Sequence, residues 1–223
     1  MCDLVLRHVP RDRAIQILDV GCGTGSLVFL LARALSAATL VGIDVSPPNI
    51  QAAEQQRAAL EASAQSRIRF EQIDYLTRRG APVDVVTSDG VLHLIPGDTR
   101  TLFARLAADV RPGGVLVVDM PYDCGYNYLF AIVRRCLRLV RSRWLDAVIF
   151  GIARLVHGKE MTDEGLRERV PYMYLPPQRL SGRSLRETIA PSVGLRLVTR
   201  YPVSSTSLSQ LKHEVLVFER QVA

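Results

Sequence analysis

Residues 17–25, which read I-L-D-V-G-C-G-T-G, constrain the fold more than any other part of the chain. A mostly apolar run leads into glycines at 21, 23 and 25, and Ser26 then opens an apolar stretch with helical spacing. Glycine lets the backbone turn sharply and lets a ligand approach main-chain N–H groups with no Cβ in the way. The segment therefore predicts a strand, a glycine turn and a helix N-terminus, which together form a nucleotide-type binding site.

The spacing of the glycines separates two classes of ligand. A dinucleotide fingerprint reads G-x-G-x-x-G, whereas here the third glycine comes one residue earlier and Ser26 stands in its place. Asp19 precedes the turn, and a carboxylate there repels phosphate oxygens and attracts a cation. The pattern favours a positively charged ligand. S-adenosylmethionine, with a sulfonium and an ammonium and no phosphate, meets that requirement.

Further segments extend this pattern along the chain. Asp44 ends an apolar run about twenty residues after the glycines, Asp74 ends the next run, and residues 83–88 and 111–118 supply two more strand-like runs. Together with D-V-G-C-G-T-G, these segments resemble the class I S-adenosylmethionine-dependent methyltransferases over residues 16–120. The resemblance implies a Rossmann-like, doubly wound α/β fold, with S-adenosyl-L-methionine as the cofactor.

The resemblance also implies cofactor contacts for individual residues. The methionine end is assigned to Asp19, Gly21 and Gly23, with the backbone of Cys22. Asp44 is assigned to the ribose. The remaining contacts, to the adenine and to the amino-acid group, are assigned to Ile43, Val45, Asp74, Tyr75 and Ser88. Taken singly, Asp44 also reads as a helix-capping residue and Asp74 as a turn residue.

Alternating strand-like and helix-like runs predict one domain over residues 1–223, with a mostly parallel, seven-stranded sheet. Strands are expected at 16–20, 39–44, 68–73, 83–88, 115–120, 195–201 and 214–218. Helices are expected at 25–35, 48–64 and 99–110. The last two strand-like runs have no long helix between them, so they predict an antiparallel final strand.

Residues 121–180 follow the fifth strand and are longer than the single helix usual there in the family. Apolar residues recur at helical spacing over 128–140 and 144–156, with arginines among them, which predicts a helical cap inserted after strand 5. Each helix is too short to span a bilayer. Three roles stay open for this cap: packing on the sheet, roofing the acceptor pocket, and peripheral contact of the basic helix with a membrane.

Methyl transfer is an in-line displacement, so a protein contributes chiefly proximity, alignment and exclusion of water. Open α/β sheets bind ligands at the carboxyl ends of their strands. This rule selects His93 after the fourth strand, and Tyr122 and Tyr126 after the fifth, as candidate catalytic residues. His93 is either a base or a packing residue, and the tyrosines are either pocket walls or cation–π partners.

Composition and charge narrow the class of partner. The chain carries a net charge of +6, but its densest arginines, at 134–143, alternate with aliphatic residues rather than exposed aromatics. Residues 88–91 read S-D-G-V and lack the Pro-Pro-aromatic segment of base-modifying amino-methyltransferases, so nucleic acid is not expected. Four scattered cysteines and four scattered histidines predict no metal site. Residues 1–13 contain no apolar leader, so the cytoplasm is the expected location.

The sequence therefore predicts methyl transfer to an oxygen, nitrogen or carbon atom of a small, apolar or aromatic metabolite, by a monomer or homodimer. Quinone-like, lipid-like and secondary-metabolite acceptors fit this description. Two alternatives stay open. The same fold can bind S-adenosylmethionine and catalyse a non-methylating reaction or use it structurally. The glycine turn can also serve a nicotinamide-dependent oxidoreductase or a nucleotide sensor.

Overall fold

The computed structural model describes residues 1–9, 13–158, 163, 166–167, 170–203 and 211–222, without the side chains of His157 and Tyr172. This part of the chain forms a seven-stranded sheet in the order β3-β2-β1-β4-β5-β7-β6. The first five strands run parallel, and β7 runs antiparallel to both of its neighbours. The predicted Rossmann-like fold is confirmed. The strands are β1 (Gln16–Val20), β2 (Thr39–Asp44), β3 (Ile68–Gln72), β4 (Val83–Asp89), β5 (Val110–Pro121), β6 (Leu195–Pro202) and β7 (His213–Arg220).

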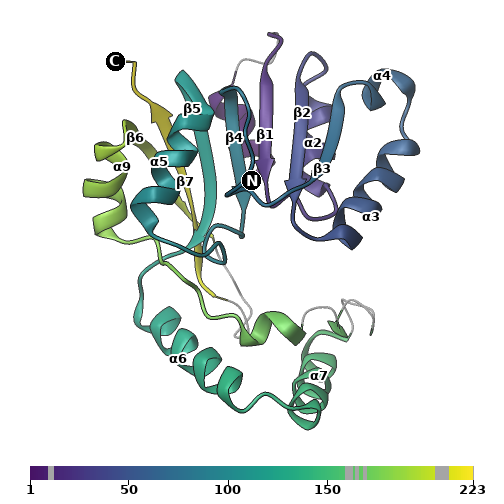
Figure 1. The fold of residues 1–223 in the computed structure, drawn as a ribbon, viewed down its shortest axis with the longest axis vertical. Helices are drawn as coiled ribbons and strands as arrows, with labels where there is room; N and C mark the ends of the chain where they lie inside the picture. Colours follow the sequence, from purple (N-terminus) through teal and green to yellow (C-terminus); the bar gives the residue numbers. More distant parts are fainter. Residues whose placement is uncertain (10–12, 159–162, 164–165, 168–169, 204–210, 223) are drawn as a thin grey trace.

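Helices cover both faces of the sheet, which is why the central strands are apolar on both sides (Figure 1). One core lies between the sheet and α1, α2 and α3, around Leu31 and Val117. The other lies between the sheet and α5, η2 and α9, around Phe103 and Phe218. The helices of these layers are α1 (Cys2–His8), α2 (Ser26–Ala34), α3 (Pro47–Ala58), α4 (Ala62–Gln65), α5 (Thr99–Asp109), η2 (Leu185–Ile189) and α9 (Ala190–Ser192).

The start of β5 differs from the prediction. The strand was expected at 115–120, but β5 begins at Val110 and includes the Pro-Gly-Gly segment at 112–114. Val83 pairs with Val110 and Val85 with Val115, so the intervening residues form a bulge opposite β4. Gly113 permits the bulge because its φ of 76° lies in the left-handed region.

Two long helices follow β5: α6 (Gly125–Leu139) and α7 (Arg143–His157), here called the helix pair. Figure 1 shows the helix pair beyond the carboxyl ends of the parallel strands, away from the helices that cover the sheet. Both helices contact η1 (Val170–Tyr174). In the described part of the chain, no helix is long and apolar enough to cross a membrane.

Candidate active site

The glycine turn after β1 is held against the end of β2. The backbone N–H groups of Gly21 and Cys22 donate to the carbonyl oxygen of Ile43, over 2.8 and 2.9 Å. The φ angles of Gly21, Gly23 and Gly25 are 73°, 55° and 85°. These angles lie in the region that glycine adopts without strain. The turn therefore depends on glycine at all three positions.

The three glycines nevertheless face different surroundings. A Cβ added to Gly21 would lie 2.6 Å from the side chain of Val91, and one added to Gly25 would lie 2.6 Å from the ring of Phe70. A Cβ added to Gly23 would meet no atom of the described structure within 4 Å. Gly21 and Gly25 are thus packed against the protein, whereas Gly23 leaves space beside its backbone. A nucleoside cofactor fits there because it can approach the main chain closely.

Asp44 supports the turn from the end of β2. Its Oδ2 accepts a hydrogen bond from the backbone of Gly23 over 3.0 Å, and its Oδ1 accepts one from the backbone of Ser46 over 2.8 Å. Ser46 is the residue that caps α3. The half-buried carboxylate therefore links the glycine turn to the next helix. Its contact with a ribose stays a prediction.

Asp19 brings a carboxylate into the centre of the sheet. It is 2% exposed, and its Oδ1 accepts a hydrogen bond from the Thr87 hydroxyl on β4 over 2.7 Å. Burial, aided by the negative charges of Asp89 and Asp44 and opposed by the Thr87 hydrogen bond, raises the pKa of Asp19 to about 7. A cation bound beside Asp19 would favour its ionised form, as the sequence argument requires.

Two of the residues predicted for the adenine site are exposed. Val45, just after β2, is 64% exposed, so its side chain is available to a ligand. Asp74 is also exposed, and its Oδ1 accepts a hydrogen bond from the backbone of Leu76 over 2.8 Å. The turn reading of Asp74 is therefore correct, and its role at the adenine edge stays a prediction.

The other two residues predicted for the adenine site lie in the core. Ile43 and Tyr75 are 1% and 4% exposed. The Tyr75 hydroxyl donates to Asp109 over 2.9 Å, and the guanidinium of Arg105 lies 5.0 Å from the ring centroid. The ring of Tyr75 is thus held toward α5, and its role as a wall of the cofactor pocket stays a prediction.

Ser88 and Cys22 are buried next to the turn. The Ser88 hydroxyl donates to the carbonyl oxygen of Val20 over 2.9 Å, which joins β4 to β1. Cys22 faces the core beside Phe70 and Gly42. Burial raises the pKa of the Cys22 thiol, so the sulfur stays protonated and unreactive. Neither side chain is available to react. The backbone contacts of Ser88 and Cys22 with a cofactor stay predictions.

An acidic group that the sequence analysis did not select lies at the ends of β4 and β5. Asp89 and Asp119 are register partners on these strands. Asp119 Oδ2 lies 3.0 Å from Nδ1 of His213, at the start of β7. Burial, and then the charge of Asp119, raise the pKa of Asp89. One sequence signal was present: Asp119 interrupts an otherwise apolar strand, at the edge where ligands bind.

His93 lies beside His213, with ring centroids 5.6 Å apart. It is 5% exposed, and its Nδ1 has no hydrogen-bond partner in the described structure. Burial lowers the pKa of His93 to about 3, helped by the charges of His213, Arg134 and Arg179. The ring is therefore neutral and weakly basic at neutral pH, which argues against the role of catalytic base.

The two predicted tyrosines lie where β5 leads into α6. Tyr122 is half-buried, and its backbone N–H donates to the carbonyl of Lys212 over 3.1 Å. Tyr126 stacks on Phe130 at 5.4 Å and carries the Lys212 ammonium 5.2 Å from its ring centroid. Tyr126 is therefore a cation–π partner of a lysine. A contact of either tyrosine with an acceptor stays a prediction.

Asn127 fastens α6 to the sheet. Its amide nitrogen donates to the carbonyls of Tyr122 and Lys212 over 2.7 and 2.8 Å. Its amide oxygen accepts from the backbone of Lys212 over 2.8 Å. A fully buried side chain with three such bonds fixes the start of α6 next to His213.

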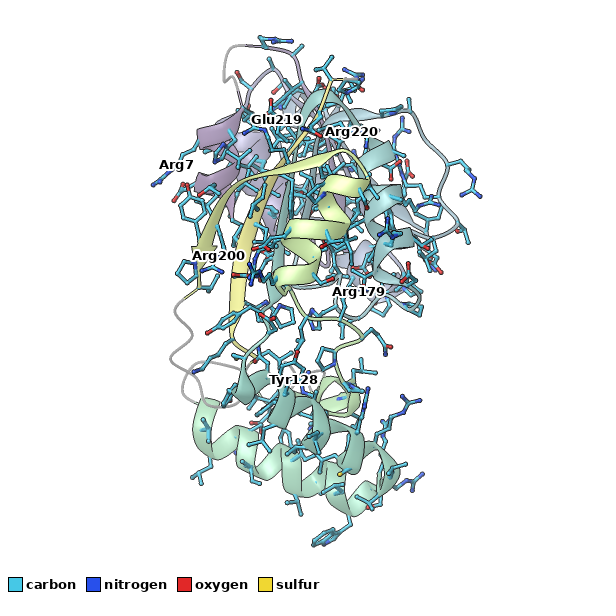
Figure 2. All side chains as sticks on the ribbon, turned by 90° about the vertical axis from the view of Figure 1, so that its left-hand side faces the viewer. Arg7, Tyr128, Arg179, Arg200, Glu219 and Arg220 are labelled. Atoms are coloured by element: carbon cyan, nitrogen blue, oxygen red, sulfur yellow. The ribbon has the colours of Figure 1, made fainter. Side chains whose placement is uncertain are left out.

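Two buried arginines lie close enough to His93 to act on its pKa. Arg134 of α6 is 8% exposed and donates to the carbonyl of Leu175 over 3.1 Å. Arg179 is 5% exposed and donates to the carbonyls of Leu92 and Gly97. Figure 2 shows Arg179 on the side of the sheet that faces the helix pair. Within the described residues neither guanidinium forms an ion pair, and the Nε of each lacks a hydrogen-bond partner.

Two further observations on the described structure concern a surface hollow and the grouping of possible metal ligands. A hollow of about 620 Å³ lies at the opposite, amino-terminal edge of the strands, between residues such as Gln16, Thr39 and Arg67. Open α/β sheets do not place their ligands at that edge. Among the residues that the structure describes, no three histidine, cysteine or acidic side chains are grouped to hold a metal ion.

Comparison with curated proteins identifies relatives of part of the chain. A trans-aconitate 2-methyltransferase of Azoarcus sp. (strain BH72) is 37% identical over 122 residues, which is 53% of this chain and 45% of that protein. A trans-aconitate 2-methyltransferase of Deinococcus radiodurans is 35% identical over 113 residues, which is 51% of this chain and 40% of that protein. The chain thus spans less than half the length of these relatives.

Solved structures share the fold at low sequence identity. A 1,6-didemethyltoxoflavin-N1-methyltransferase of Burkholderia thailandensis, solved with S-adenosylhomocysteine, matches with a TM-score of 0.64 at 16% identity, over 99% of this chain and 76% of that one. The [4+2]-cyclase SpnF matches equally well, with a TM-score of 0.64 at 16% identity, over 100% of this chain and 80% of that one.

A family model described as a methyltransferase domain matches residues 18–116. This match covers the strand, glycine turn and carboxylates described above. Residues 18–116 of the chain are therefore similar to a methyltransferase domain, and the described structure has the fold of the solved methyltransferase.

Proposed function

We propose that the protein binds S-adenosylmethionine and transfers its methyl group to a small molecule that carries a carboxylate. The observation that carries the cofactor assignment is the open space at Gly23, whose backbone donates to Asp44, in the turn that follows the buried Asp19. When bound, the cofactor supplies a methyl group activated by a positively charged sulfur. The methyltransferase activity for which the relatives are named and the S-adenosylhomocysteine bound to a protein of the same fold support the same assignment.

The residues at this site suit a cation more than a phosphate. Asp19, Asp89 and Asp119 end or interrupt three neighbouring strands, so negative charge is concentrated at one edge of the sheet. Such a group attracts an ammonium and a sulfonium, and it opposes the diphosphate of a dinucleotide. A nicotinamide-dependent reaction is therefore the weaker alternative.

The acceptor class follows from the buried arginines. An unpaired charge inside a protein costs several kcal/mol in lost hydration, so an anion that pairs with it is strongly favoured. Arg134 and Arg179 are buried near His93 and form no ion pair with a described residue. By contrast, Arg186 is paired with Glu214 at 2.9 Å. A carboxylate on the acceptor would supply the negative charge that these two guanidinium groups lack. An acid such as the trans-aconitate in the relatives' name meets this requirement.

A carboxylate acceptor also removes the need for a base. Its oxygen is already ionised at neutral pH and acts directly as the nucleophile. This accords with a His93 whose basicity is suppressed. The protein's task is then to orient the acid and exclude water. This proposal replaces the apolar or aromatic acceptor expected from the sequence, because that expectation did not take the two buried guanidinium groups into account.

The experiment measures S-adenosylhomocysteine formation with a panel of small di- and tricarboxylic acids and their neutral amides. Acids are expected to be methylated and the amides not. Changing Arg134 or Arg179 to Met should raise KM for the acid at least tenfold, because a charged hydrogen bond contributes about 1.5–3 kcal/mol. The matched control is Arg111→Met, an exposed arginine paired with Asp84 at the far edge of the sheet.

Two outcomes would contradict the proposal. Equal turnover of amides and acids, with KM unchanged in both variants, would reject the carboxylate acceptor while leaving methyl transfer in place. Binding of S-adenosylhomocysteine without methylation of any acceptor would favour the non-methylating alternative, since the [4+2]-cyclase SpnF has the same fold. Thermal unfolding of each variant separates lost binding from lost stability, because Arg179 also holds two loop carbonyls.

A further inference from the structure

The helix pair places its apolar side chains on the outside. At about 100° per residue, the exposed apolar side chains of α6 fall within an arc of about 140°. Those with more than 40% exposure are Tyr128, Leu129, Ile132, Val133 and Leu139. The buried side chains of α6 are Asn127 and Arg134, which lie on the opposite side of the helix. An ordinary surface helix has the reverse arrangement, with its apolar stripe toward the core.

The second helix repeats the arrangement. Its most exposed apolar side chains lie within an arc of about 120°, and these are Trp144, Ile152, Leu155 and Val156, at 74%, 58%, 88% and 61% exposure. None of the described side chains of α7 is fully buried. We call the exposed apolar arcs of α6 and α7 together the outer face. Single exposed apolar residues are normal on a protein, but exposed apolar residues gathered along one side of each helix indicate a binding surface.

Positive charge borders this outer face. Residues 125–158 contain six arginines and one acidic residue, Asp146. Five of the arginines are exposed: Arg135, Arg138, Arg141, Arg143 and Arg154. By helical geometry, Arg135 and Arg138 lie along one side of the apolar arc of α6, and Arg143 and Arg154 lie along one side of that of α7. Long arginine side chains can bury their stems while keeping the charge at a polar boundary.

We propose that the outer face of the helix pair binds the surface of a membrane rich in anionic lipids. Amphipathic helices with an apolar arc and a basic border lie in the plane of such a surface. Each helix has 15 residues and so is about 22 Å long, short of the roughly 30 Å needed to cross the hydrocarbon layer. The helices therefore lie on the membrane.

The charge selects a membrane over a second copy of this chain. A symmetric dimer through the outer face would bring the exposed arginines of both copies to one interface, where they would repel each other. Anionic headgroups supply the opposite charge, and the acyl chains take up the apolar arc. This inference is independent of the acceptor: it concerns a surface formed by side chains that face away from Asn127 and Arg134.

Trp144 provides a direct probe, because it is the one tryptophan of the chain and lies on the outer face. The full chain is mixed with vesicles of phosphatidylcholine alone or with 30% phosphatidylglycerol. With the anionic vesicles, Trp144 emission should shift to shorter wavelength, acyl-chain-brominated lipid should quench it, and the protein should float with the vesicles. Neutral vesicles should bind much more weakly, and added salt should reduce binding to anionic ones.

Two variants separate the apolar and electrostatic contributions. Leu139→Gln with Leu155→Gln alters two side chains that are 85% and 88% exposed and should weaken vesicle binding at least tenfold without affecting folding. Arg135→Gln with Arg138→Gln should weaken it about thirtyfold, since one cation near an anionic surface contributes roughly fivefold. The matched control is Leu30→Gln with Val222→Gln, at exposed apolar positions outside the helix pair, which should bind like the original chain.

Three results would overturn the proposal. The first is equal binding of all variants to anionic vesicles. The second is the absence of any change in Trp144 emission with lipid. The third is a concentration-dependent dimer, seen in sedimentation without lipid and abolished by Leu139→Gln with Leu155→Gln, which would assign the outer face to a second copy. S-adenosylhomocysteine affinity of each variant, measured in parallel, shows whether a loss of vesicle binding reflects a loss of the folded cofactor site.

Discussion

Residues 18–116 and the helix pair bury their side chains in opposite ways. In the first region, β1 presents four consecutive buried residues, and Gly21 and Gly25 of the following turn are packed against the side chains of Val91 and Phe70. In the second, apolar side chains point to solvent, while an asparagine and an arginine are buried. The family model matches the first region and ends before the second begins.

Apolar residues therefore have different roles in the two regions. In the sheet, apolar residues build the core. The polar exceptions Asp19, Asp89 and Asp119 lie on β1, β4 and β5 and belong to the candidate site. In the helix pair, the polar exceptions Asn127 and Arg134 attach the helix to the protein, and the apolar residues are left for a partner. The buried polar residues Asp19, Asn127 and Arg134 are therefore informative in both regions, since burying a polar group requires a compensating contact.

The largest effect is expected from a matched pair of glycine changes in the sheet region. Gly21→Ala should lower the free energy of unfolding by about 3 kcal/mol, because it adds left-handed strain to a clash with Val91. Gly23→Ala carries only the strain, about 1 kcal/mol, but should weaken S-adenosylhomocysteine binding strongly. Chemical denaturation and calorimetry measure the two effects. Equal stability losses with unchanged binding would show that Gly23 does not face the cofactor.

A smaller effect is expected from Asp19, whose pKa is raised to about 7. The ammonium group of S-adenosylhomocysteine is attracted only by the ionised carboxylate, so affinity for this ligand should rise about tenfold between pH 6 and pH 8. Asp19→Asn should bind weakly and lose this dependence, whereas Thr87→Val, which removes the hydrogen bond to Asp19, should move the rise to higher pH. Calorimetry across this range is the measurement. A flat pH profile in the original chain would exclude Asp19 from the cofactor site.

The smallest effect on turnover is expected from His93. Its pKa of about 3 means that it does not titrate between pH 6 and 8, so His93→Gln should leave the shape of the pH–rate profile unchanged. Stability should respond instead. Because the folded-state pKa lies below the ordinary value of 6.5, the original chain loses stability as the pH falls below 6.5, and His93→Gln should lose less. A hundredfold drop in turnover with intact stability would restore His93 as the base.

Much of the sheet region could be predicted because its signals are local. Glycines with positive φ, carboxylates at strand ends and continuous apolar strands are each visible within a few residues, and the strand bounds agree closely with the prediction. The main discrepancy there is the bulge at Gly113, which depends on pairing with a strand almost thirty residues earlier.

The rest of the candidate site could not be read in this way because it is assembled from distant segments. His213 reaches Asp119 across 94 residues, and Arg179 reaches Leu92 across 87. Helical spacing correctly indicated the helices at 125–139 and 143–157. Periodicity shows that apolar residues share one side of a helix, but not which part of the protein that side faces. Whether that stripe faces the core or the solvent depends on what else the fold places beside it.

The three carboxylates at the ends of β1, β4 and β5 also imply a kinetic order. An anionic acceptor that arrives first meets Asp19, Asp89 and Asp119 and is repelled. After the positively charged donor is in place, that repulsion is offset. For the proposed acid acceptor we therefore expect ordered sequential kinetics, with the donor binding first and with S-adenosylhomocysteine inhibiting competitively against the donor and not against the acid.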